Sequence, residues 1–166
     1  MSKVSMKRTK ELINVQIAAD PAIGEGKRLA GVLLLVAVGL RVLTLLSELV
    51  CAVGGMIEFN PANVGSLVVS ILFAYMIYQG IGVLAYLPVI GGVVMVIQAF
   101  LYDYLTVILS NEYWPQARIY AFLFLINGLY QIGAFLFLVL NRKTKLYFAA
   151  YKQAEATIRA ENTLQK

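Results

Sequence analysis

The sequence predicts an all-α, polytopic membrane protein, an antiparallel bundle of four transmembrane helices. Of its 166 residues, 60% are hydrophobic and only 14% are charged, and the mean hydropathy is +0.77. A soluble domain is about half apolar and about a quarter charged, so the excess of apolar residues indicates a lipid environment. Lysines and arginines gather at the two ends of the chain, outside the apolar runs, as membrane proteins place them.

Four apolar runs are each long enough to cross the hydrocarbon core, which takes about 20 helical residues. Lipid offers no partners to unpaired backbone groups, and none of the runs alternates apolar and polar residues as a barrel strand does. The sequence therefore predicts four transmembrane helices within one domain, residues 29–140. The runs cover residues 29–53, 64–87, 89–109 and 119–140.

The segments between the runs have ordinary turn chemistry. The first connection, "GGMIEFNPANVG", and the third, "SNEYWPQAR", combine glycine, proline and polar residues. The second, "YLPVIGG", is shorter. Its Pro88, Gly91 and Gly92 predict a tight hairpin between the second and third spans.

Both ends of the chain are predicted to lie in the cytoplasm. Six basic residues precede the first span and six follow the last, which by the positive-inside rule puts both ends on the cytoplasmic side of the cell membrane. In the N-terminal segment, residues 1–28, Leu12, Ile13 and Ile17 fit the apolar face of a short helix on the membrane surface. The C-terminal tail, residues 141–166, is rich in helix formers and is predicted to continue the fourth span near the headgroups.

A cluster of polar residues is predicted at similar depths inside the membrane. An unpaired arginine at the bilayer centre costs at least about 2.5 kcal/mol, so Arg41 should face the other helices and pair with Glu48 or Asp103, either directly or through a network of an arginine, water and a carboxylate. Side-chain amides would complete its surroundings, because they donate and accept together. The cluster is either structural, holding helices together by hydrogen bonds, or the lining of a functional cavity. Its members are Arg41, Glu48, Gln98, Asp103, Asn127 and Gln131.

A row of small residues lies on the second span. Ser66, Ser70 and Ala74 are spaced by four and permit a close approach of another helix. This row predicts packing within the chain, with a dimer face as the alternative.

Several function classes lack their usual residues. The chain has no histidine and a single cysteine, Cys51, so it lacks the commonest general base and any cysteine pair. Neither a glycine-rich phosphate loop nor a metal-ligand spacing is present. We therefore expect no enzymatic activity, no cofactor and no metal. We also expect no nucleic-acid partner, because the basic residues flank apolar spans.

Two segments, "LAGVLLLVAVGLRVLTLL" and "FLVLNRKTKLYFAAYK", resemble small four-span bacterial membrane proteins that are grouped as a domain of unknown function. In that group a "G-W-L" start opens the first span and a basic, aromatic tail follows the fourth. Val32 stands here at the position of the tryptophan. The group has no assigned activity, so the resemblance implies only a four-span fold and a membrane location.

The sequence favours a protein that acts through contacts in the membrane. Small loops and a basic helical tail are typical of accessory subunits, assembly factors and immunity proteins, so the expected partners are the lipid bilayer and another membrane protein or a second copy. The alternative is a small transporter or channel with a polar site around Arg41. Glu48 would suit coupling to a cation, whereas a cavity at Arg41 would suit an anionic ligand. The sequence does not identify a small-molecule ligand.

Overall fold

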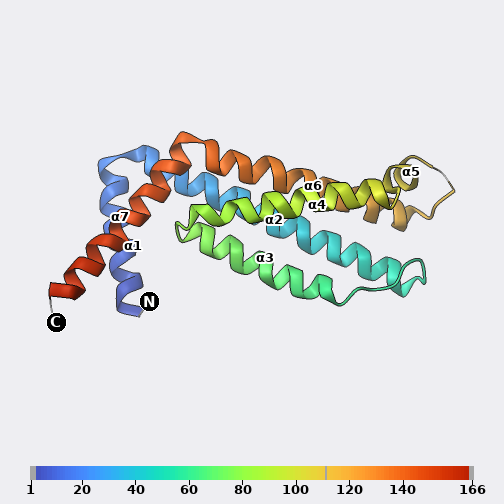
Figure 1. Cartoon of the computed structure of the whole chain (residues 1–166), viewed down its shortest axis with the longest axis horizontal. Helices are drawn as coiled ribbons and strands as arrows, with labels where there is room; N and C mark the ends of the chain where they lie inside the picture. The colour runs from blue at the N-terminus through green and yellow to red at the C-terminus, as the bar shows by residue number, and fades with distance from the viewer. Residues whose placement is uncertain (1–2, 111, 165–166) are drawn as a thin grey trace.

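The computed structural model describes residues 3–110 and 112–164, and every regular element within them is helical. The elements are α1 (Lys3–Ala19), α2 (Pro21–Val53), α3 (Ala62–Tyr78), the 3-10 turn η1 (Gly82–Ala85), α4 (Tyr86–Leu101), α5 (Tyr104–Leu109), α6 (Pro115–Leu140) and α7 (Arg142–Leu164). The helices α2, α3, α4 and α6 run side by side along the longest axis and alternate in direction (Figure 1). We call them the axial helices. At the end where α2 begins, α1 and α7 pack against each other and turn away from this axis (Figure 1).

Within the described residues, three helical segments are long and apolar enough to cross a membrane. They are α2 with 33 residues, the segment Gly82–Leu101 with 20 and α6 with 26, whereas α3 is apolar but has only 17. The axial helices also expose many large apolar side chains, among them Leu35, Leu72, Phe100 and Leu140. Exposed apolar surface of this extent marks a region that contacts a membrane or another protein. The prediction of an all-helical protein with apolar helices of membrane-spanning length is therefore confirmed.

The connection between the second and third apolar runs differs from the prediction. The chain reverses before residue 86, at Gly80, which has φ +87 and lies so close to Tyr151 that an added Cβ would be 2.4 Å from its ring. Only glycine fits this backbone conformation without strain. Pro88 lies instead in the first turn of α4, where its missing N–H needs no partner, and Gly91 and Gly92 lie inside the helix. The predicted hairpin over "YLPVIGG" is therefore wrong.

The third apolar run is also interrupted. α4 ends at Leu101, and α5 follows Asp103, whose φ of 54 is left-handed. Aspartate tolerates this conformation because its short side chain can hydrogen-bond locally. Here the Asp103 carboxylate accepts a hydrogen bond from the Thr106 hydroxyl at 2.8 Å. Residues 89–109 thus form parts of two helices rather than one continuous span.

The N-terminal segment packs against protein along its apolar face. Ile13 is buried, and Leu12 and Ile17 pack against the same core, with α7 and α2 as the neighbouring helices of α1. The face predicted to lie on lipid is thus covered by protein, because amphipathic helices bury their apolar faces against each other. Asp20 then caps α2 by accepting a hydrogen bond from a backbone N–H of its first turn at 2.9 Å. As a result, α2 begins eight residues before the predicted span boundary at residue 29.

The C-terminal tail is helical as expected, but it does not continue α6. The backbone turns at Asn141, which has φ −66 and ψ 130, and the Asn141 side chain accepts a hydrogen bond from the Lys143 N–H at 2.9 Å. The Tyr147 hydroxyl donates to the backbone carbonyl of Tyr78 and so fastens α7 to the end of α3. Burial raises the pKa of the Tyr147 phenol, so it stays a proton donor. Residues 165 and 166 of the predicted tail lie outside the described residues.

Candidate functional site

A pocket of about 380 Å³ lies among the four axial helices. α2 packs against α3 and α6, and α4 packs against α6, but α3 and α4 scarcely touch. α4 and α6 approach each other closely at Gly92 and Gly128. A Cβ added at Gly92 would lie only 2.7 Å from the Gly128 carbonyl oxygen. The exposed lining residues are Val69 of α3 and Leu87 and Gly91 of α4. The pocket therefore opens between α3 and α4, onto the apolar outer surface.

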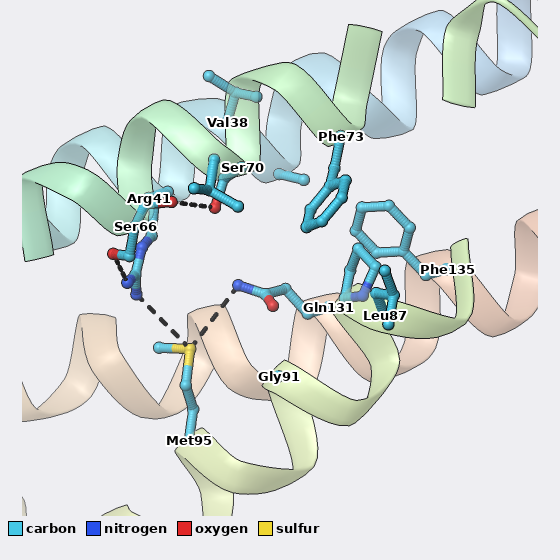
Figure 2. Close-up of a pocket in the computed structure, with 13 residues that line it drawn as sticks. Val38, Arg41, Ser66, Ser70, Phe73, Leu87, Gly91, Met95, Gln131 and Phe135 are labelled. Carbon is cyan, nitrogen blue, oxygen red and sulfur yellow. Dashed lines mark hydrogen bonds between the residues drawn. The ribbon is translucent and has the colours of Figure 1, made fainter. Parts of the chain in front are cut away.

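The pocket is apolar at one end and polar at the other (Figure 2). The apolar walls are formed by residues that include Val38, Phe73, Leu87 and Phe135. At the other end Arg41 of α2, Ser66 and Ser70 of α3, Met95 of α4 and Gln131 of α6 come together.

Arg41 points into the protein and binds neutral groups. Its Nη2 donates to the Ser66 hydroxyl oxygen, and its Nη1 lies 3.7 Å from the Met95 sulfur. The Ser66 hydroxyl in turn donates to the Asn63 carbonyl at 2.8 Å, so the lone pairs of its oxygen remain for Arg41. In the described part of the chain, none of the ion pairs involves Arg41. The positive charge thus lacks a directly paired carboxylate.

Gln131 approaches the same sulfur from α6. Its Nε2 donates to the Asn127 side-chain oxygen at 3.1 Å and lies 3.7 Å from Met95 Sδ. Asn127 is fully buried, and its Nδ2 donates to the Thr44 hydroxyl oxygen at 3.5 Å. As Figure 2 shows, the Arg41 and Gln131 nitrogens converge on one thioether. The structure thus brings Arg41, Asn127 and Gln131 together, as the sequence suggested.

Glu48 lies close to this cluster but binds other residues. Its carboxylate, in a residue only 4% exposed, accepts two hydrogen bonds from Asn63 Nδ2 at 2.8 and 2.9 Å and one from the Asn60 N–H at 3.3 Å. Arg41, Glu48 and Tyr120 all line a small cavity of about 10 Å³. That is room for roughly one water molecule, so the two charges face each other across a gap.

Two predicted members lie apart from the cluster. Asp103 is exposed beyond the end of α4, and its carboxylate binds Thr106. The predicted pairing of Asp103 with Arg41 is therefore wrong, because the helix that would have carried Asp103 ends before it. Gln98 is half-buried on α4, and its side chain makes no hydrogen bond to the described residues of the cluster.

The small residues of α3 face into the protein. Ser66 and Ser70 line the pocket, and Ala74 packs against the hydrophobic core. The Ser70 hydroxyl donates to the Ser66 carbonyl at 2.8 Å. The row of small residues thus lies on the side of α3 that packs within the chain.

The sequence analysis did not identify three residues that contribute to the polar cluster, namely Thr44, Asn63 and Met95. Thr44 and Glu48 follow Arg41 at intervals of three and seven, so helical spacing could have indicated Thr44. Asn63 looks like a residue of the loop, and Met95 looks like an ordinary apolar side chain of a span. Their roles depend on which helices are neighbours.

Among residues 3–110 and 112–164, no cluster of three or more histidine, cysteine or acidic residues could hold a metal ion. Comparison with protein-family models, with curated proteins and with solved structures finds no match to this chain. Its function therefore has to be inferred from the geometry of the pocket.

Proposed function

We propose that the chain crosses the cell membrane four times, with both termini in the cytoplasm. The basic residues at the two ends of the sequence support this orientation, as does the alternating direction of the axial helices (Figure 1). α3, with 17 residues, is about 25 Å long, somewhat less than a hydrocarbon core of about 30 Å. Local thinning of the bilayer accommodates such a difference at modest cost.

We further propose that the protein binds a lipophilic small molecule, which enters the pocket from the bilayer between α3 and α4. The observation that carries this proposal is the 380 Å³ pocket with an apolar wall and several polar groups directed to one point. Ligand sites typically have volumes of about 300–1,000 Å³ and this mixture of surfaces. The pocket thus favours the polar site around Arg41 over a role limited to contacts with other membrane proteins.

Binding rather than catalysis is proposed. The polar lining consists of a guanidinium, an amide and hydroxyl groups, and the chain has no histidine. No residue of this lining is an evident general base.

A tryptophan placed in the pocket tests the proposal. The variant carries Phe73→Trp, with Trp114→Phe to remove the native tryptophan, and is titrated with dibrominated stearate and with its methyl ester. Bromine quenches tryptophan on contact, so a bound chain quenches in a saturable way. The matched control is Leu72→Trp, because Leu72 lies next to Phe73 on α3 but is 55% exposed on the outer surface.

We expect saturable quenching for the pocket tryptophan with at least one probe, and only gradual quenching, proportional to probe content, for the control. Gly91→Leu should abolish the saturable phase, since a side chain at Gly91 extends toward Gln131 within the pocket. Gly133→Leu is its control, because a Cβ at Gly133 meets nothing within 4 Å. Identical curves at the two tryptophan positions would show that the pocket takes up no ligand.

A further inference from the structure

We propose that the head of the ligand is an anionic oxyacid, a carboxylate or a phosphate on an apolar chain. One of its oxygens binds between Arg41 and Gln131, where the Met95 sulfur lies in the structure. This inference rests on the proposed function and adds the chemical class of the ligand. Three features of the pocket carry it.

The first feature is a pair of strong donors that share a weak acceptor. Arg41 Nη1 and Gln131 Nε2 each lie 3.7 Å from Met95 Sδ (Figure 2). A thioether sulfur is among the weakest acceptors in proteins, whereas guanidinium groups bind anionic oxygens through short and strong hydrogen bonds. The two donors thus aim at a point that an anionic oxygen would occupy with much greater gain.

Met95 can leave this point. Methionine is unbranched, has three rotatable side-chain bonds and adapts readily to its surroundings. The Met95 side chain borders the pocket, so it can move when a ligand oxygen arrives. The sulfur then holds the donors in place only while the site is empty.

The second feature is the charge of Arg41. Glu48 is the acidic residue nearest in the helix, but Asn63 and the Asn60 N–H occupy its carboxylate. No acidic side chain lines the pocket, and Arg41 forms no ion pair within the described residues. Glu48 faces Arg41 only across the cavity of about 10 Å³, and a guanidinium inside a membrane is costly without a directly paired countercharge. An anionic ligand supplies that countercharge.

The third feature is the direction of the pocket. Ser66, at the polar end, lies about 6 Å from the start of α3 at a rise near 1.5 Å per residue. Phe73 and Leu87, at the apolar end, lie toward the end of the axial helices where α1 and α7 pack (Figure 1). An amphiphile of the leaflet opposite α1 and α7 has this same direction, with its head outward and its chain toward the middle of the membrane. The pocket volume of 380 Å³ is at the small end of the range for ligand sites. This volume suits a ligand with a single apolar chain.

The test compares head groups on the same chain, with the Phe73→Trp, Trp114→Phe protein in uncharged detergent at alkaline pH. The probes are dibrominated stearate, its methyl ester and a lysophosphatidate with the same brominated chain. We expect both acids to reach half-saturation at a mole fraction about 10-fold or more below that of the ester. Acetate and inorganic phosphate are added as competitors, to distinguish an amphiphile from a water-soluble anion.

Arg41→Gln, added to this protein, should weaken acid binding to near the level of the ester, while Arg41→Lys should retain a preference for acids. If Arg41→Gln does not fold, the comparison of acid with ester on the pocket tryptophan still decides. Equal, saturable binding of acid and ester would overturn the anionic head but leave the proposed function standing. Saturation by none of the probes would overturn both. Competition by acetate or phosphate as strong as that by stearate would overturn the apolar chain.

Discussion

Replacing Asn63 by leucine tests how the start of α3 is held against α2. The Glu48 carboxylate is 4% exposed, and Asn63 Nδ2 lies 2.8 and 2.9 Å from its two oxygens. A hydrogen bond to a charged group contributes about 1.5–3 kcal/mol, and a buried acceptor left without a partner costs a further desolvation penalty. The Asn60 N–H, at 3.3 Å, remains as a partner. We therefore expect Asn63→Leu to lower the free energy of unfolding by about 2–3 kcal/mol.

The measurement is reversible unfolding in mixed micelles with increasing dodecyl sulfate, followed by helical circular dichroism. A double-mutant cycle with Glu48→Met isolates the interaction, because methionine has a similar length but lacks both carboxylate oxygens that accept from Asn63. We expect a coupling energy of at least about 1.5 kcal/mol. Gln98→Leu is the matched control, since the Gln98 amide forms no hydrogen bond with the described residues of the cluster, and it should cost little. A coupling energy of zero would refute the pairing of Glu48 with Asn63.

Three further predictions concern topology and packing. Reporter fusions after Glu58 and after Lys145 should report opposite sides of the membrane, and the same side for both would contradict four spans. Gly26→Ala should destabilise the protein by about 3 kcal/mol or more, since its Cβ would lie 2.1 Å from a backbone carbonyl oxygen of α7. Gly39→Ala is the control, because a Cβ at Gly39 meets nothing within 4 Å, and it should stabilise the protein by up to about 1 kcal/mol through helix propensity. If thermal unfolding shows the same loss of stability for Gly26→Ala and Gly39→Ala, the contact between Gly26 and α7 is refuted. Tyr147→Phe should cost about 1–3 kcal/mol by leaving a carbonyl of α3 without its donor, and an unchanged melting temperature would show that this bond contributes nothing.

The polar cluster was only partly predictable from the sequence. Arg41, Asn127 and Gln131 share a depth along apolar runs, and the cost of burying a charge requires them to face inward. Depth does not say which helices are neighbours, however. The sequence therefore could not indicate that Arg41 binds Ser66 and Met95 rather than a carboxylate.

The connections between helices were harder to place than the helices themselves. Proline and glycine mark turns on average, yet Pro88 also fits the first turn of a helix. The chain reverses at Gly80, where the positive φ and the nearby Tyr151 ring of α7 both require a residue without a Cβ. Such a contact involves residues far apart in the chain, so no local pattern contains it.

The sequence by itself determined the helical class of this protein, the apolar runs that require lipid and the concentration of positive charge at its two ends. These properties follow from composition and local pattern, because backbone groups in lipid must be satisfied within their own helix. Only the tertiary structure decided that α1 covers α7, that Asp103 lies outside the cluster, and that α3 and α4 leave a pocket between them. A pocket depends on which helix faces do not meet, and that is a property of the packed helices together.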